Sequence, residues 1–187
     1  MHVTDDHWLI PAKRLESPNW NERPDPDALE VVVVHCICLP PGELGERYIH
    51  DLFLNRLDTR AHPSFASLEG VRVASHLLIN RRGAVTQYVS FDRRAWHAGE
   101  SVWRRRPGCN DYSIGIELEG ADDRPFTDRQ YRKLRQVLEA LMRRYPRLSP
   151  DAVVGHYEVA PGRKTDPGAG FDWRRVLLGD ASAEARS

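Results

Sequence analysis

Residues 30–39 have the sequence Glu-Val-Val-Val-Val-His-Cys-Ile-Cys-Leu, and Pro-Pro-Gly follows directly at 40–42. A run of consecutive valines that ends at such a breaker is typical of a central strand buried on both faces of a sheet. His35 lies near the carboxyl end of this predicted strand. Two interpretations of His35 are open: a core histidine with satisfied hydrogen bonds, or a ligand in a site at the end of the strand.

A second stretch, residues 71–79, alternates in the way that a strand with two different faces does. The alternation places Arg72 and His76 on the same face. A turn at 80–83 and a return strand at 84–89 complete a predicted hairpin.

A third stretch, residues 112–120, places Gly115, Glu117 and Glu119 on one face and large aliphatic residues on the other. These two carboxylates either face solvent, or at least one of them points into a site. A further short strand is predicted at 152–156, where it ends in a histidine.

Helical periodicity is present at 43–57 and at 127–145. The second helix is predicted to begin with a capping box, Thr-Asp-Arg-Gln at 127–130, and to stop before Pro146. We expect it to cover one face of the sheet. A final short helix is predicted at 171–178.

The remaining segments carry no clear periodicity. Residues 1–29 are predicted to be irregular, with a few aromatic side chains packed onto the core. Residues 58–70 are predicted to form a loop, in which His62 is a loop residue rather than a ligand, and 179–187 a flexible tail. The length of 187 residues, without an internal repeat or linker, predicts one domain over 1–187.

The composition excludes several classes of function. Apolar residues make up 41% and charged residues 29% of the chain, as is usual for a soluble globular protein. The formal net charge of zero gives no reason to expect a nucleic-acid partner, and no apolar run approaches the roughly 20 residues that cross a membrane. The N-terminus lacks the features of a signal peptide, and the odd number of cysteines favours reduced thiols. We therefore expect a cytoplasmic protein.

A candidate metal site emerges from the stretch 155–168, a Pro- and Gly-rich loop that carries His156 and Asp166. His35 and His156 both lie near the carboxyl ends of predicted strands. If those strands are neighbours, both histidines and Asp166 meet at one edge of the sheet. Two histidines and one carboxylate leave a fourth tetrahedral position for water, which is the pattern of a catalytic zinc site.

The surrounding residues indicate what such a site would do. Zinc lowers the pKa of its water to about 7 and polarises a carbonyl group. Glu117 or Glu119 is a candidate base for the proton of that water, and Lys164 a candidate to stabilise the oxyanion. Together these parts predict hydrolysis of an amide bond.

Two polar segments have two interpretations each. Trp96 either packs into the core or, with His97, forms the wall of a groove. The run Arg104-Arg105-Arg106 is either a solvated surface or, beside a site for an acidic ligand, a carboxylate clamp.

Several motifs together carry a resemblance to a known family. They are Val33-Val34-His35 followed by Leu39-Pro40-Pro41-Gly42, Arg72-Val73-Ala74-Ser75-His76, Arg94-Ala95-Trp96-His97-Ala98-Gly99, Cys109-Asn110-Asp111-Tyr112-Ser113-Ile114-Gly115-Ile116-Glu117-Leu118-Glu119-Gly120 and Arg163-Lys164-Thr165-Asp166-Pro167-Gly168. From about Trp8 to Leu178 the chain resembles the cytoplasmic N-acetylmuramyl-L-alanine amidases of the AmpD type. The wider zinc amidase family includes phage lysozyme-like amidases and peptidoglycan recognition proteins.

The resemblance implies a role for each matching residue. Zinc-activated water attacks the amide, Glu117 is the general base and acid, and Lys164 stabilises the oxyanion together with the zinc. The implied zinc ligands are His35, His156 and Asp166, and the implied substrate-binding residues are Arg72, Trp96, His97 and Arg106.

The resemblance also implies a fold and a substrate. The fold is a mixed α/β domain with a central mixed β-sheet flanked by helices. The substrate is 1,6-anhydro-N-acetylmuramic acid that carries an L-Ala-γ-D-Glu-diaminopimelate peptide, cut between lactyl group and L-Ala during peptidoglycan recycling. In some bacteria the loss of this activity induces a chromosomal β-lactamase. We expect a monomer with no nucleic-acid or membrane partner.

Two other functions stay open. One is a phage or envelope amidase that acts on polymeric peptidoglycan, and the other is a non-catalytic peptidoglycan-binding module. The chain also departs from the family, which usually has His-Asn-Ile-Ser where this chain has His-Cys-Ile-Cys at 35–38. Cys36 and Cys38 are either small packing residues or thiols that bind zinc or sense oxidation.

Overall fold

A six-stranded mixed sheet forms the centre of the protein, for which the computed structural model describes residues 1–177. The strand order is β12-β5-β11-β6-β7-β3, and all neighbours are parallel except the antiparallel pair β6–β7. The strands are β12 (Val153–Gly155), β5 (Val31–Ile37), β11 (Ser113–Glu119), β6 (Leu77–Ile79), β7 (Val85–Gln87) and β3 (Lys13–Arg14). This architecture confirms the expected mixed α/β fold.

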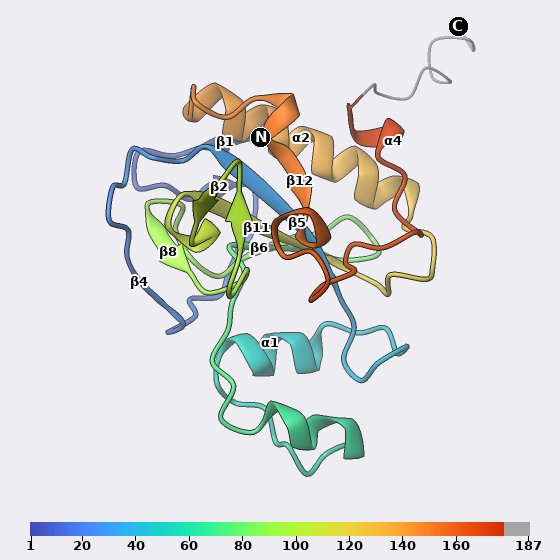
Figure 1. Ribbon diagram of the computed structural model, residues 1–187. Helices are drawn as coiled ribbons and strands as arrows, with labels where there is room; N and C mark the ends of the chain where they lie inside the picture. The colour runs from blue at the N-terminus through green and yellow to red at the C-terminus, as the bar shows by residue number, and fades with distance from the viewer. Residues whose placement is uncertain (178–187) are drawn as a thin grey trace, which may run out of the picture.

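Helices lie on both sides of the sheet, as Figure 1 shows for α2 (Asp128–Arg144) and α1 (Arg47–Phe53). The predicted capping box is confirmed at the start of α2, where the Thr127 hydroxyl accepts a hydrogen bond from the Gln130 amide. α1 is shorter than predicted, because Gly45 before it and Asn55 after it both have positive φ. Within the described residues, no helix is long and apolar enough to cross a membrane.

Short elements complete the chain. The short helices are α3 (His156–Val159) and α4 (Arg174–Leu177), and the 3-10 turns are η1 (Pro63–Leu68), η2 (Cys109–Asp111) and η3 (Pro150–Ala152). The short strands outside the central sheet are β1 (His2–Val3), β2 (Leu9–Ile10), β4 (Trp20–Glu22), β8 (Arg93–Ala95), β9 (Val102–Trp103) and β10 (Arg106–Pro107). The predicted loop at 58–70 thus contains η1, which His62 caps. The predicted tail at 179–187 lies outside the described residues.

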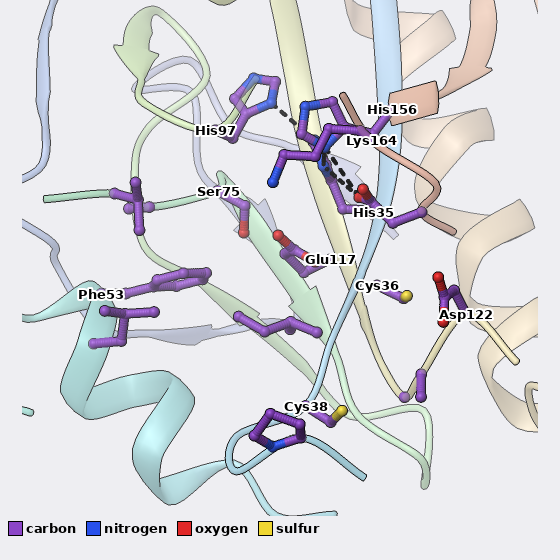
Figure 2. Close-up of a pocket in the computed structure, with 18 of the residues that line it drawn as sticks. His35, Cys36, Cys38, Phe53, Ser75, His97, Glu117, Asp122, His156 and Lys164 are labelled. Atoms are coloured by element: carbon purple, nitrogen blue, oxygen red, sulfur yellow. Dashed lines mark hydrogen bonds and ion pairs between the residues drawn. The ribbon is translucent and has the colours of Figure 1, made fainter. Parts of the chain in front are cut away.

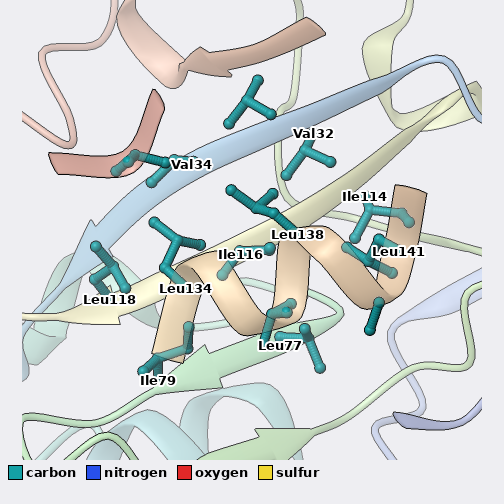
Figure 3. Close-up of a cluster of buried hydrophobic side chains, with 14 of the residues drawn as sticks. Val32, Val34, Leu77, Ile79, Ile114, Ile116, Leu118, Leu134, Leu138 and Leu141 are labelled. Atoms are coloured by element: carbon teal, nitrogen blue, oxygen red, sulfur yellow. The ribbon is translucent and has the colours of Figure 1, made fainter. Parts of the chain in front are cut away.

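Successive side chains of β5 and β11 point to opposite faces of the sheet, and for this reason the core has two sides. Val32 and Val34 face α2, together with the aliphatic side chains of β11, whereas Val31 and Val33 belong to a second cluster on the opposite side. Figure 3 shows the first cluster between the sheet and α2, with Leu134, Leu138 and Leu141 on the helix. The prediction of a strand buried on both faces is confirmed.

Two predictions are wrong. The N-terminal segment is not simply irregular: β3 forms the edge of the central sheet, and β4 pairs with β8. The strand expected at 71–79 covers only Leu77–Ile79, because the chain before it leaves the sheet: the backbone amide of Ala74 donates to the carbonyl of Trp96. Arg72 is therefore exposed while His76 is buried, and they share no strand face.

Candidate active site

A cleft of about 460 Å³ lies at the carboxyl ends of β5, β11 and β12. These strands are parallel, so their carboxyl ends share one edge of the sheet. Such an edge is the usual ligand site of an open α/β sheet. Figure 2 shows the labelled side chains converging there from different parts of the chain. Those that the sequence singled out and that line the cleft are His35, Cys36, Cys38, Trp96, His97, Glu117, His156, Lys164 and Asp166.

His35, His156 and Asp166 form a compact cluster in this cleft. β12 pairs with β5 in parallel, so that Gly155 lies opposite Val34 and the next residue of each strand is a histidine. The predicted neighbourhood of these strands is confirmed. The two Nδ1 atoms are 2.9 Å apart, and the Asp166 Oδ2 atom lies 3.1 Å from each of them. The backbone amide of Tyr157 donates to the carbonyl of Asp166 at 3.1 Å and ties the loop to the strand end.

The chemistry of these donors fits a zinc ion. The Nε2–H group of His156 donates to the carbonyl of Ala98 at 3.1 Å, which leaves its Nδ1 lone pair free to face the cluster. Burial lowers the pKa of His35 to about 4, so this imidazole is neutral. Burial acts to raise the pKa of Asp166, but the close contacts of its carboxylate with the rings of His156 and His35 outweigh burial and hold that pKa below its usual range. Neutral imidazole and ionised carboxylate are the forms that bind metal.

Glu117 points into the same cleft from β11, opposite His35 in the strand register. Its side chain is 9% exposed, and among the described residues its Oε2 atom has no hydrogen-bond partner. Burial raises the pKa of Glu117 well above its ordinary value, the charge of Asp166 raises it further, and Lys164 opposes both. An unpaired buried carboxylate is costly for folding and is typical of a functional group.

Glu119 lies on the same strand face but has a different environment. Its two carboxylate oxygens accept hydrogen bonds from the backbone amides of Gly45 and Arg81, at 2.7 and 2.8 Å. Both glutamates are buried, so the alternative that they form a solvated face is wrong. Glu119 joins two loops to the sheet, and Glu117 alone of the pair is available to a ligand.

Lys164 reaches the cleft from the loop between α3 and Asp166, as Figure 2 shows. Its backbone amide donates to the carbonyl of Ala160 at 3.1 Å, which fixes the turn that carries it. The side chain is exposed, so its ammonium group can meet a ligand without first leaving a buried pair. Trp96 forms another part of the lining, and its indole N–H donates to Asn21 Oδ1 at 2.7 Å.

Two predicted substrate-binding residues lie outside the cleft. Arg72 lines a separate hollow beside Leu68 and Val71. Arg106 forms an ion pair with Glu30 at 3.1 Å. Its neighbour Arg104 pairs with a surface carboxylate in the same way, which favours a solvated surface over a clamp for this run.

The cleft also contains residues to which the sequence gave no definite role. Burial raises the pKa of the Cys36 thiol, and Cys38 Sγ accepts a hydrogen bond from the Gly42 amide at 3.2 Å. Both observations favour packing over metal binding for these thiols. Asp122 was missed, because its short polar turn carries no motif; its carboxylate accepts a hydrogen bond from Thr165 at 2.7 Å.

Gly115 is required by the packing of His97. A Cβ atom at position 115 would lie 2.4 Å from Cγ of His97, far inside van der Waals contact. We expect Gly115→Ala to reduce the free energy of unfolding by about 1–3 kcal/mol, the usual cost of overpacking. Thermal unfolding of the metal-free protein checks this, and the unfolding temperature should fall by about 2–4 °C for each kcal/mol lost.

The double variant Gly115→Ala/His97→Ala is the matched control for this prediction. Removal of the ring clears the contact, so the double variant should be more stable than the sum of the single effects predicts. Strictly additive effects would show that the ring does not occupy the space above Gly115.

Comparisons with known proteins agree along nearly the whole chain. Residues 25–169 match the profile of the family described as N-acetylmuramoyl-L-alanine amidase. The chain is 50% identical over 176 residues to the 1,6-anhydro-N-acetylmuramyl-L-alanine amidase AmpD of Escherichia coli, covering 94% of this chain and 96% of that one. It is 46% identical over 169 residues to the corresponding amidase of Haemophilus influenzae, covering 90% and 92%.

Solved structures show the same similarity. A crystal structure of a selenomethionine AmpD derivative superposes with a TM-score of 0.91 at 49% identity and covers 95% of this chain and 98% of that chain. The amidase AmiD from Escherichia coli, solved in complex with the substrate anhydro-N-acetylmuramic acid-L-Ala-D-γ-Glu-L-Lys, has a TM-score of 0.60 at 26% identity. This chain is covered to 95% in that comparison, and AmiD to 65%.

Proposed function

Because the chain belongs to the N-acetylmuramoyl-L-alanine amidase family, we propose that it cleaves the bond between lactyl group and L-Ala in 1,6-anhydro-N-acetylmuramyl peptides. The observation that carries the proposal is the unpartnered carboxylate of Glu117 in the same cleft as the cluster of His35, His156 and Asp166. It is supported by the two relatives named as 1,6-anhydro-N-acetylmuramyl-L-alanine amidases, which match this chain over nine-tenths or more of its length.

In the proposed mechanism His35, His156 and Asp166 hold one zinc ion. When bound, zinc supplies a Lewis acid that polarises the amide carbonyl and makes water nucleophilic at neutral pH. Glu117 accepts a proton from the attacking water and passes it to the leaving nitrogen of L-Ala. The pKa of Glu117 is raised by burial and by the nearby Asp166, which suits a group that must hold that proton between the two steps.

Lys164 completes the proposed set. Its ammonium group extends into the cleft, and a point charge there stabilises the negative charge that develops on the carbonyl oxygen. Trp96 offers an apolar wall against which the sugar ring or the lactyl methyl group can pack. The cavity volume of about 460 Å³ falls in the range of small-molecule sites. A muropeptide monomer therefore suits the cleft.

We place this reaction in the cytoplasm, in the recycling of peptidoglycan fragments. The free thiols of Cys36, Cys38 and Cys109 support that place, because disulfides are rare in the cytosol. The protein would act there as a monomer. In an organism with an inducible chromosomal β-lactamase, loss of this activity would raise muropeptide levels and induce that enzyme.

The direct test compares two substrates in parallel: 1,6-anhydro-N-acetylmuramyl tripeptide and intact sacculi. We expect rapid release of tripeptide from the monomer and little release from sacculi. Samples treated with a chelator, and then supplied again with zinc, serve as controls. A higher rate on sacculi would contradict the recycling role and favour an envelope or phage amidase, and binding without cleavage of either substrate would favour a binding module.

A further inference from the structure

The two proposed histidine ligands are contacted from behind by adjacent residues of one segment. The Nε2 atom of His35 lies 3.0 Å from Nδ1 of His97, and Nε2 of His156 lies 3.1 Å from the carbonyl oxygen of Ala98. In both ligands the contacted nitrogen is the one that faces away from the cluster. Residues 97–98 are therefore placed to decide which nitrogen of each ligand carries the proton.

Hydrogen bonding through His97 continues to a third residue. Nε2 of His97 lies 3.1 Å from the hydroxyl oxygen of Ser113, on β11. A neutral imidazole has one N–H group and one lone pair, so its two contacts must have opposite polarity. If the Ser113 oxygen accepts from His97, then His97 Nδ1 accepts from His35, and the lone pair of His35 Nδ1 points at the cluster. The opposite polarity would put a proton on that Nδ1 atom and block a metal ion.

We propose that His97 is a positioning residue of the metal centre, which holds His35 in the tautomer that offers Nδ1, while the Ala98 carbonyl does the same for His156. The inference rests on the proposed zinc centre and adds to it the residues that orient its ligands. It also gives His97 a role distinct from the groove wall that the sequence suggested.

The segment itself is rigidly held. Asn110 Oδ1 accepts hydrogen bonds from the backbone amides of His97 and Ala98, at 3.2 and 2.8 Å, and the Asn110 side chain is buried. The buried Arg23 guanidinium donates to the carbonyls of Asn110 and Ser113, at 2.9 and 2.7 Å. Gly115 leaves the space that the His97 ring fills. Buried side chains that bond to backbone in this way fix the segment, and such preorganisation is what a supporting shell requires.

The test measures zinc affinity in three variants by competition with a chromophoric chelator. His97→Phe keeps a ring of similar size but cannot accept a hydrogen bond, and its zinc affinity should fall about 10–100-fold, the usual effect of losing an outer partner. His97→Asn places an acceptor oxygen where Nδ1 was, so its affinity should stay close to that of the wild type. His50→Phe is the matched control, because His50 bonds to Tyr88 and to none of the proposed ligands.

The absorption spectrum of the cobalt(II)-substituted protein gives a second readout, since it reports ligand geometry without catalysis. We expect a changed spectrum for His97→Phe only. Unaltered zinc affinity in His97→Phe would overturn the inference, as would an equal loss in His97→Asn, which would indicate ring packing instead of hydrogen bonding. A wild-type protein that binds no zinc would instead refute the proposed centre itself.

Discussion

Replacement of Glu117 by glutamine is expected to lower kcat by about 10²- to 10⁴-fold, the range that a positioned general base contributes, while zinc still binds. Glutamine has the shape of glutamate but cannot take a proton from water at neutral pH. No zinc ligand is altered, since the proposed set is His35, His156 and Asp166. The measurement combines steady-state kinetics on the anhydromuramyl tripeptide with the zinc content of the purified variant.

The stability of this variant separates a lost base from a damaged fold. Glu117 Oε2 has no hydrogen-bond partner among the described residues, and burial of an unpaired carboxylate opposes folding. The glutamine variant should therefore unfold at the same temperature as the wild type or at a higher one. Such a gain in stability with a loss of activity is typical of a residue kept for function.

Glu119→Gln is the matched control, because Glu119 lies two residues further along the same buried face. Its carboxylate accepts from two backbone amides, and an amide side chain can accept from only one of them. We expect a lower unfolding temperature and a kcat, per folded protein, near that of the wild type. A Glu117→Gln variant that retains most of its kcat would contradict the proposed role of Glu117.

The contrast between these glutamates illustrates what the sequence can predict. Alternation at 112–120 placed both on one face, and that is how β11 presents them. Their separation into a structural and a free carboxylate depends on the amides of Gly45 and Arg81. Those amides come from loops distant in sequence, and no local pattern reports where a loop amide will lie.

Long periodic elements were predicted well for a physical reason. The valines of β5 and the apolar face of α2 are buried over many consecutive turns or pleats, so the pattern is repeated often enough to be recognised. The short strands β1 to β4 have two or three residues each, and a period cannot be detected over such a length. Their pairing is decided by the partner strand instead.

The supporting contacts of the site were not predictable in the same way. His97 was recognised as a site residue, but its bond to His35 depends on the ring's direction and on the space above Gly115. Likewise Arg72 belongs to a family motif, yet its side chain lines a different hollow. The strand that was expected to direct this side chain begins only at Leu77. A family motif gives the residue type, and only packing gives the direction.

Removal of the metal ion should abolish turnover, and one equivalent of zinc should restore it. Two imidazoles and one carboxylate converge within 4.8 Å in this structure, and the remaining residues of the proposed mechanism supply a base and a positive charge but no Lewis acid. His156→Ala should bind zinc far more weakly and remain inactive at the zinc concentration that restores the wild type. Measurements are the rate on the anhydromuramyl tripeptide and the zinc content after dialysis.

Thermal unfolding gives this prediction a readout that is independent of catalysis. A ligand that binds only the folded state at 100 times its Kd stabilises it by about 2.7 kcal/mol, so zinc should raise the unfolding temperature of the wild type by about 5–11 °C. His156→Ala should show almost no such rise, because one of three ligands is gone. Cys36→Ala is the control beside the site: if its thiol is only a packing group, the full rise remains. Full activity after a chelator has removed the metal would contradict this prediction. It would mean that Glu117 and Lys164 activate water and stabilise the oxyanion without a metal ion, and the cluster of His35, His156 and Asp166 would need a different explanation.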